Sequence, residues 1–379
     1  MNNYRVIDFP VSDKYYLGKF IDFTYKNEIY HGDKNYIPPL RMELSQRFSP
    51  SINPFFKHGQ MHLFMVEYKG KIVGRASAHI DFQYVDYHQS KTGYFGFFEC
   101  VNDVEASKLL LEHACRWIKG KGMTDVIGPI SPTMSDEIGV LAEGFSAPVI
   151  LTGYNPPYYP ELLINNDFNI VKTWYAWQVE IKAFTEKEGW LKSVTKDLEK
   201  RFQVQIRSVN MKKFDEELEI VKYLFNECWK NNWGFTPITD DDVKYVGSKL
   251  KSIVDPDLTL FAYINGQPVG VSVTLPNINE FISDFHGNLS PWNMAKLLYR
   301  LKFRKMKSMR VFILGVLEEY RNRGLSALLY TKTALEVSKK GYTWGEASMT
   351  LEDNWGVNNV IKNAGGVLYK KFFIFGKKL

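Results

Sequence analysis

This sequence of 379 residues has little cysteine, no long apolar run and no large excess of one charge. Its three cysteines, Cys100, Cys115 and Cys228, have no C-x-x-C spacing, so we expect reduced thiols and neither a disulfide framework nor a zinc site. No stretch reaches the roughly 18 uninterrupted apolar residues of a membrane span, and residues 1–14 lack the apolar core of a signal peptide. These absences predict a cytoplasmic protein with no membrane span and no metal.

The composition that remains is that of an ordinary globular chain. Hydrophobic residues make up 45% and aromatic residues 15%, which excludes a disordered or fibrous protein. Lys and Arg number 48 against 42 Asp and Glu, and a net charge of +6 permits an anionic ligand without requiring nucleic acid. The length of 379 residues favours two domains.

One segment concentrates basic residues. Between residues 296 and 310 lie Lys296, Arg300, Lys302, Arg304, Lys305, Lys307 and Arg310, with no acidic residue among them. Leu297, Leu298 and Leu301 recur there near helical spacing, so the segment is interpreted as the solvated face of an amphipathic helix or, alternatively, as a surface that attracts phosphate. Nucleic-acid binding is a third and weaker alternative, because aromatic and basic residues do not alternate strongly.

Two parts of the chain repeat one order of elements. Residues 62–74 and 260–270 each predict a β-hairpin that carries the pattern G-x-x-V-G. After each hairpin we expect a strand and then a helix that ends at Lys-Gly, at 94–100 and 106–122 in one copy and at 311–317 and 326–341 in the other.

The repeated order predicts the fold class. A hairpin, a strand, a helix, a strand and an Asn-led helix form an α/β unit with a mixed sheet and helices on its faces. The polar stretch after residue 181 places the boundary between two such units near residue 190. We therefore expect domains at 1–190 and 191–379.

The most informative motif lies between residues 311 and 330. The apolar run at 311–317 predicts a buried strand. It is followed by the turn Arg321-Asn322-Arg323-Gly324-Leu325-Ser326 and then by a helix. A helix N-terminus offers unpaired N–H groups and the positive end of a dipole, and Gly324 lets the main chain approach an anion closely. Arg321 and Arg323 can add charge-assisted hydrogen bonds. The turn therefore predicts a phosphate-binding loop.

This turn resembles the signature R/Q-x-x-G-x-G/A of the GNAT acyltransferase superfamily, with Ser326 at the last small position. The resemblance extends over residues 214–369. It implies two GNAT-like domains in tandem, of which the second binds acetyl-CoA, or another acyl-CoA, as cosubstrate. The residues that it assigns to this cosubstrate are Val316, Leu317, Arg321, Asn322, Arg323, Gly324, Leu325, Ser326 and Asn354, with main-chain groups at Val316 and Leu317 holding the acyl carbonyl.

The resemblance also directs attention to catalytic groups. In the superfamily a glutamate, or water held by one, often takes the proton of the acceptor amine, and the matching candidates are Glu346 and Glu352. Asp353 is a third candidate carboxylate, which alternatively serves as a helix N-cap. The tyrosine that many members place seven residues after the helix-leading Asn is replaced by Ile361. The general acid is therefore unassigned, and Tyr320, Tyr330 and Tyr369 are its possible substitutes.

The first domain lacks the loop. Asp103 and Glu105 stand where the second copy has arginine and glycine, and acidic residues repel pyrophosphate, so we interpret residues 1–190 as a degenerate copy. Its Pro- and Gly-rich loops, with Tyr158 among them, are expected to shape an acceptor pocket. In the second domain Trp233 and Phe235 follow the first helix and are expected to line the acceptor side.

These observations predict an N-acyltransferase, an N-acetyltransferase by preference, that transfers acetyl from acetyl-CoA to an amine of a small molecule or peptide by direct attack. A longer or carrier-bound acyl donor is one alternative. A non-catalytic acyl-CoA-binding or sensing protein, suggested by Ile361, is another. The sequence leaves the acceptor and the oligomeric state open.

Overall fold

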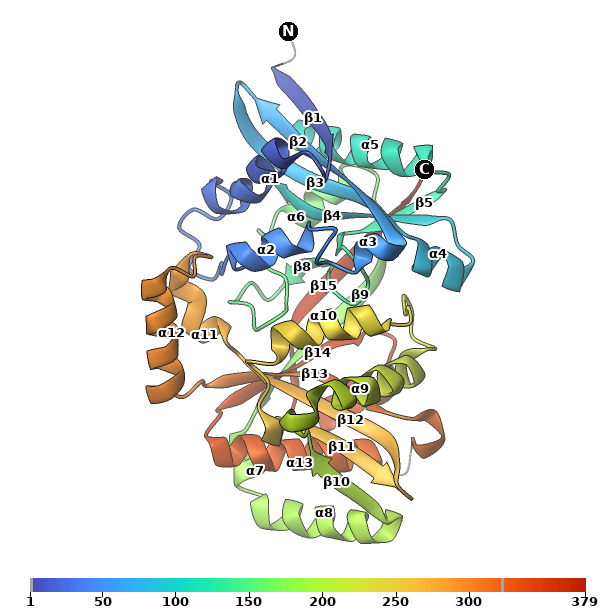
Figure 1. Cartoon of the computed structure of the whole chain (residues 1–379), viewed down its shortest axis with the longest axis vertical. Coiled ribbons are helices and arrows are strands. Elements are labelled where there is room, and N and C mark those ends of the chain that lie inside the picture. The colour runs from blue at the N-terminus through green and yellow to red at the C-terminus, as the bar shows by residue number, and fades with distance from the viewer. Residues whose placement is uncertain (1–2, 322–323) are drawn as a thin grey trace. The chain divides into compact units, whose positions relative to one another are not determined.

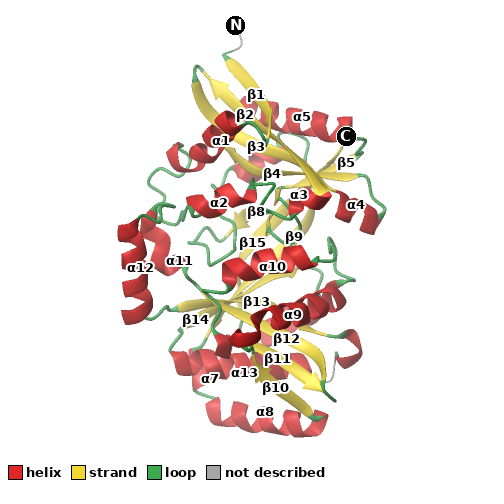
Figure 2. Ribbon diagram, in the orientation of Figure 1, coloured by secondary structure: helices red, strands yellow, loops and turns green. Residues whose placement is uncertain are grey.

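The computed structural model describes residues 3–321 and 324–379, and the chain divides into two compact units (Figure 1). Unit 1 consists of Met1–Trp174, Ile282–Leu297 and Lys370–Leu379, and unit 2 of Tyr175–Phe281 and Leu298–Tyr369. In each unit parallel and antiparallel pairs of strands are flanked by helices (Figure 2). The mixed α/β class predicted from the sequence is confirmed.

Unit 1 is built largely from the first half of the chain. Its elements are β1 (Tyr4–Pro10), α1 (Lys14–Lys26), α2 (Arg41–Arg47), α3 (Phe55–His58), β2 (Gly59–Tyr68), β3 (Lys71–Asp81), α4 (Phe82–His88), β4 (Thr92–Cys100), α5 (Val104–Gly120), β5 (Asp125–Gly128), β6 (Ile130–Ser131), β7 (Glu137–Ile138), β8 (Val140–Glu143) and α6 (Tyr159–Ile164). The strand order is β1-β2-β3-β4-β5-β15, in which β4 and β5 are parallel.

Unit 2 follows the same plan. The elements after α6 are β9 (Asn169–Glu180), α7 (Lys182–Thr185), α8 (Glu188–Phe202), β10 (Val204–Ser208), α9 (Phe214–Trp229), α10 (Asp240–Leu250), β11 (Thr259–Ile264), β12 (Gln267–Pro276), α11 (Asn279–Ile282), α12 (Pro291–Phe303), β13 (Ser308–Val316), α13 (Leu325–Lys340), β14 (Trp344–Leu351), α14 (Trp355–Asn363) and β15 (Val367–Lys378). They belong to unit 2 except for the parts of β9, α11, α12 and β15 that fall within the bounds of unit 1 given above. The strand order is β9-β14-β13-β12-β11-β10, in which β13 and β14 are parallel.

The last strand of the chain completes the sheet of unit 1. Residues Phe375 to Lys378 of β15 pair with β5, and Lys371 to Phe373 pair with β8. The buried Lys370 ammonium donates to the main-chain oxygens of Ser146 and Ala147, at 3.1 and 3.0 Å. The C-terminal residues therefore belong to the core of the first unit.

The two predicted hairpins form as expected. The turn between β2 and β3 is Lys69-Gly70, and the turn between β11 and β12 is Asn265-Gly266. All four residues have positive φ angles, between 48° and 82°, as a type I′ turn requires. Asn and Gly adopt this conformation at little cost, which is why the short sequence signal located these turns.

Helices cover both faces of the sheet in unit 2. A Cβ added at Gly270 would lie 3.1 Å from Leu329 of α13, whereas one at Gly315 would lie 2.4 Å from the Trp229 ring of α9. Gly270 pairs with Val316, the neighbour of Gly315, and neighbouring residues of a strand point to opposite faces. Helices α9 and α13 therefore pack on opposite faces of the sheet, and each comes close to a glycine of a strand.

In both units the parallel pair of strands separates partway along its length. Strands β13 and β14 pair from Ser308–Trp344 to Val311–Ala347, but β13 continues to Val316. Strands β4 and β5 pair from Thr92–Asp125 to Tyr94–Ile127, while β4 continues to Cys100. We call the region where the strands have parted the seam of each unit.

The seam of unit 1 is filled by the chain itself. The Ser131 hydroxyl accepts a hydrogen bond from the main-chain N–H of Phe97 at 2.9 Å. A Cβ added at Gly96 would lie 1.8 Å from the Ile130 carbonyl oxygen, so the β6 segment lies directly on β4.

Because the seam of unit 1 is filled, one added methyl group at Gly96 should lower the stability of the protein. Gly96→Ala drives its Cβ into main-chain atoms that cannot rotate away, so we expect the thermal unfolding midpoint to fall by roughly 3–10 °C. Gly120→Ala at the end of α5, where the added Cβ meets no described atom within 4 Å, should leave the midpoint unchanged or slightly raised. Circular dichroism melts measure both, and equal midpoints would contradict a filled seam.

Candidate functional site

The N-terminus of α13 lies beside the open seam of unit 2. Gly324 precedes the helix with φ 80° and ψ 2°, a left-handed conformation that glycine adopts freely. In the described part of the chain no side chain caps this helix end. The first N–H groups of a helix have no partner within the helix, so this helix end is a candidate anion site. Asn322 and Arg323, which the sequence assigned to the loop, lie outside the described residues.

The equivalent helix end in unit 1 is already occupied. The Asp103 carboxylate accepts hydrogen bonds from the main-chain N–H groups of Glu105 and Ala106, at 3.0 and 3.1 Å. The Tyr4 hydroxyl donates to the same carboxylate at 2.5 Å, and this hydrogen bond raises the pKa of Tyr4 to about 12. A fixed negative charge therefore sits where unit 2 leaves its helix dipole uncompensated.

Arg321 binds main chain of its own unit. Its Nε donates to the Val316 carbonyl at 3.2 Å, and its Nη2 donates to the Cys228 carbonyl at 2.5 Å. The guanidinium thus fastens the end of β13 to the end of α9. The sequence identified this arginine as a phosphate ligand and gave no sign that it also fixes the loop.

Two further predicted loop residues, Leu325 and Ser326, differ in how far they are buried. Leu325 is fully buried and anchors the first turn of α13, while Ser326 is partly exposed at the helix start. A Cβ added at Gly324 would be in ordinary contact with Leu198 and Phe202 of α8, at 3.5 and 3.6 Å. A small side chain at Gly324 would therefore pack against α8 without a clash.

Main-chain groups of β13 face the seam. The Leu317 N–H donates to the Val269 carbonyl at 2.9 Å, so Leu317 belongs to the ladder with β12. In an antiparallel ladder every second residue bonds to the partner, so the polar groups of Leu314 and Val316 point toward the seam instead. Val316 and Leu317 were both predicted to hold the acyl carbonyl, but the Leu317 N–H is already bonded to Val269. Leu314 was missed because only the register identifies it.

Glu346 lies in a buried cluster on β13 and β14. Its side chain is fully buried and accepts hydrogen bonds from the Ser348 and Tyr369 hydroxyls. Arg310, opposite it in the ladder, places Nε 3.8 Å from the carboxylate and donates to the Ser348 hydroxyl at 3.0 Å. Each oxygen of the Glu346 carboxylate is thus engaged.

Burial shifts the pKa values of Arg310 and Tyr369, the partners of Glu346. Burial lowers the pKa of the Arg310 guanidinium from its ordinary value, and the facing Glu346 carboxylate opposes that change. Burial and the same carboxylate raise the pKa of Tyr369 far above its ordinary value, so its hydroxyl stays protonated. The sequence grouped Arg310 with the solvated basic segment, whereas the structure buries it in β13.

Glu352 is placed differently. It follows the last residue of β14 and is partly exposed. Asn358 of α14 fixes its main chain by donating to the carbonyls of Leu351 and Glu352, at 2.9 and 3.2 Å. Asn354 caps α14 by accepting from the Val357 N–H at 3.3 Å. Glu352 thus has a fixed backbone and a side chain that solvent can reach.

Of the predicted acceptor residues, Phe235 is buried against Phe225, with ring centroids 6.0 Å apart. Phe225 in turn stacks on Trp229, the ring that contacts Gly315 of β13. Trp233 is partly exposed in the same loop. Tyr158 belongs to unit 1, where its hydroxyl donates to the Cys100 carbonyl at 2.9 Å.

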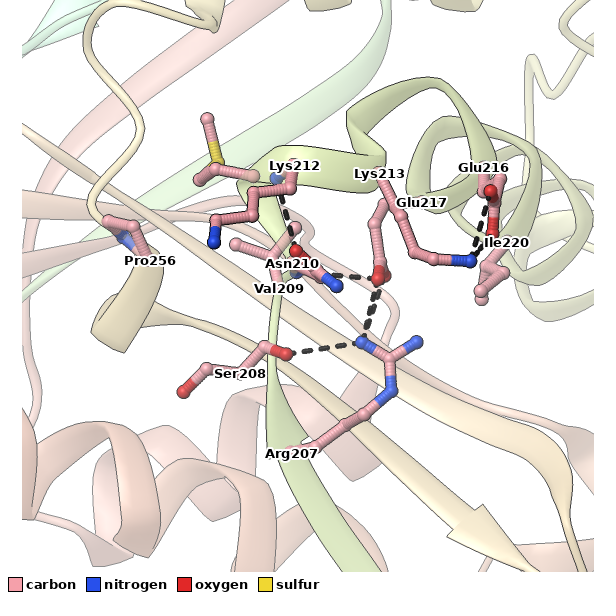
Figure 3. Close-up of a pocket in the computed structure, with 11 residues that line it drawn as sticks. Arg207, Ser208, Val209, Asn210, Lys212, Lys213, Glu216, Glu217, Ile220 and Pro256 are labelled. Atoms are coloured by element: carbon pink, nitrogen blue, oxygen red, sulfur yellow. Dashed lines mark hydrogen bonds and ion pairs between the residues drawn. The ribbon is translucent and has the colours of Figure 1, made fainter.

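A cavity of about 900 Å³ lies at the edge strand β10 of unit 2 (Figure 3). It is lined by the end of β10 and the start of α9, and most of its charges are paired: Arg207 meets both oxygens of Glu217, at 2.9 and 3.0 Å, and Lys213 meets Glu216 at 2.9 Å. In the strand order β13-β12-β11-β10, two strands lie between β10 and β13. This cavity is therefore separate from the seam.

The chain resembles two curated proteins over nearly its whole length. It is 31% identical over 356 residues to a protein named bacterial ceramide synthase from Caulobacter vibrioides, covering 92% of this chain and 91% of that protein. It is 32% identical over 368 residues to protein YghO of Escherichia coli, covering 96% and 93%. A search of protein-family models found no match.

Solved structures show the same fold at much lower identity. A tandem GNAT protein from the clavulanic acid biosynthesis pathway superposes with a TM-score of 0.58 at 10% identity, covering 99% of this chain and 98% of its own. A GCN5-related N-acetyltransferase from Sphaerobacter thermophilus gives 0.52 at 11% identity, covering 100% and 96%. The chain therefore has the tandem GNAT fold and belongs to the family of the bacterial ceramide synthase and protein YghO.

Proposed function

We propose that this protein is an N-acyltransferase that carries a fatty acyl group from acyl-CoA to the amine of a long-chain amino alcohol. A relative over nine-tenths of the chain is named bacterial ceramide synthase, and a ceramide is the amide of a fatty acid with such an amine. The sequence alone favoured acetyl from acetyl-CoA, with a longer acyl group as an alternative. The relative's name favours the longer donor.

The observation that carries the proposal is the difference between the two helix ends. The N-terminus of α13 has no described side-chain cap beside an open seam, while Asp103 and Ser131 fill the equivalent positions in unit 1. A pyrophosphate suits the first position and is repelled from the second. We therefore assign acyl-CoA binding to the second domain, expected at 191–379, and treat the first as a degenerate copy.

The proposed chemistry uses the open seam. With the pyrophosphate at Gly324 to Ser326, the pantetheine arm would run along β13, where the main chain of Leu314 and Val316 faces the seam. A main-chain N–H there would polarise the thioester carbonyl and stabilise the oxyanion of the tetrahedral intermediate. Collapse of the intermediate forms the amide and releases the coenzyme A thiolate, whose conjugate thiol has a pKa of about 8.5 and leaves without a strong acid.

The amine must lose a proton before or during attack, and we assign its removal to Glu352. The partly exposed side chain of Glu352 can reach the acceptor directly or through one water. Glu346, the second predicted catalytic residue, is engaged by Arg310, Ser348 and Tyr369, so we propose that it positions β13 against β14. Trp233 and Phe235 remain our proposed acceptor-side residues in this unit, and Tyr158 in the other.

Donor and acceptor panels test the proposal. Purified protein is given acyl-CoA of 2 to 18 carbons together with a long-chain amino alcohol, spermidine or a lysine peptide. We expect thiol release and an amide product, detected by mass spectrometry, to be at least tenfold faster with long donors and the amino alcohol. Preference for acetyl-CoA would restore the acetyltransferase assignment. Tight coenzyme A binding without transfer to any amine would support a sensing protein.

Separate substitution of each glutamate by glutamine distinguishes the catalytic base from the residue that positions the strands. Glu352→Gln should lower kcat by about 10²–10⁴-fold while leaving the unfolding midpoint unchanged. Glu346→Gln should lower stability by about 3–5 kcal/mol, because it leaves the buried Arg310 without its charge partner. Steady-state kinetics and thermal melts of both variants are compared with Asp353→Asn, an exposed neighbour. Full activity of Glu352→Gln would exclude it as the base.

A further inference from the structure

Helix α12, orange in Figure 1, is unusual because every one of its residues is at least partly exposed. It occupies the segment between β12 and β13. Its large apolar side chains include Trp292, Leu298 and Phe303, which are 78%, 60% and 64% exposed. Exposed apolar residues occur singly on most proteins, but a cluster on one helix marks an interaction surface.

The amphipathic pattern of α12 is inverted. At about 100° per residue, the four half-buried positions, Asn293, Lys296, Leu297 and Arg300, fall within one arc of roughly 100°. The opposite arc of roughly 200° is largely apolar. It holds Trp292, Met294, Ala295, Leu298, Tyr299, Leu301 and Phe303, with Lys302 among them.

Polar side chains fasten α12 to the protein. Lys296 forms an ion pair with Asp284 at 2.5 Å, and Arg300 donates to the main-chain oxygen of Phe281. The Asn293 amide donates to the Asn288 carbonyl at 2.7 Å. Because the polar side of the helix is turned inward and bonded, the apolar side is held outward.

Basic residues adjoin this apolar face. Lys302, Arg304, Lys305 and Lys307 are all exposed, and the sequence has no acidic residue between Asp284 and Glu318. The Glu280 carboxylate of α11 accepts hydrogen bonds from the main-chain N–H groups of Lys307 and Ser308, at 2.9 and 2.7 Å, and so borders the far end of this segment. The segment thus combines an outward apolar face with a flank on which exposed lysines and arginines predominate.

We propose that α12 docks on the surface of an anionic lipid bilayer. A helix that lies in a membrane interface buries large apolar side chains among the acyl chains and sets lysines and arginines against anionic headgroups. Trp292 and Tyr299 suit the headgroup level, because their rings are apolar and their N–H and O–H groups need water. Within the described residues no helix is long and apolar enough to span a bilayer, so the contact proposed is peripheral.

Two other occupants fit the face less well. An acidic carrier protein would pair with the lysines but leave the wide apolar arc without a partner. A second copy of this chain would bring one positive flank against another, at an electrostatic cost. An anionic bilayer provides a partner for both the apolar arc and the basic flank. The inference rests on α12 alone and is independent of the acyl transfer proposed above.

Vesicle flotation with the full-length protein tests this inference. We expect the protein to float with vesicles of phosphatidylcholine and phosphatidylglycerol at 7:3, and to bind phosphatidylcholine alone at least tenfold more weakly. Raising sodium chloride from 0.1 to 0.5 M should weaken binding to the anionic vesicles, because charge attraction to the surface is screened.

Variants locate the contact. The triple change Trp292→Ser, Leu298→Ser and Phe303→Ser, and separately Lys302→Gln, Lys305→Gln and Lys307→Gln, should each lower vesicle affinity at least tenfold. The changed side chains are exposed, so the thermal midpoint should not move. Trp190→Ser on α8, which removes a tryptophan that is 63% exposed, is the matched control and should bind like wild type.

Three outcomes would overturn the proposal. Absence of binding to anionic vesicles is one, and unchanged binding by both triple variants is another. The third outcome starts from a wild-type protein that does not bind vesicles. In that case the apolar triple change would either dissociate a dimer, measured by analytical ultracentrifugation, or abolish binding to an acidic acyl carrier protein.

Discussion

A parallel pair of strands that separates partway along its length leaves main-chain N–H and C=O groups without ladder partners, and those groups must be bonded by something else. In unit 1 the chain provides the partners itself, through Ser131 and the β6 segment. In unit 2 strand β13 runs beyond Val311 without a ladder to β14. We propose that this difference between a filled and an open seam decides which unit binds an extended ligand, and the neighbouring helix ends differ in the same way.

The open seam is held in place by interactions on each side. Arg321 ties the end of β13 to α9, and the Trp229 ring packs on Gly315. The buried pair of Arg310 and Glu346 lies where the ladder is about to end. A buried ion pair contributes little net stability but is costly to break, so its role here is to fix the position at which the strands separate.

The sequence predicted what depends on local pattern. The Asn265-Gly266 turn, the strand before the loop and the helix after it, expected from Ser326 and found from Leu325, are each specified by a few adjacent residues. The seam filling by Ser131, the pairing of β15 with β5 and the Arg310–Glu346 contact join residues far apart in sequence, and no local period encodes them. Arg310 was misplaced because charge count alone cannot distinguish a buried strand arginine from the exposed lysines before it.

Titration calorimetry of wild type, Gly324→Asp and Gly324→Asn tests most directly whether coenzyme A binds at one site, at α13. Both residues tolerate the left-handed conformation, but the aspartate reproduces at α13 the negative charge that Asp103 supplies in unit 1. We predict one coenzyme A per chain for wild type and Gly324→Asn, and at least tenfold weaker binding for Gly324→Asp. Two sites per chain, or unchanged binding by Gly324→Asp, would contradict the account.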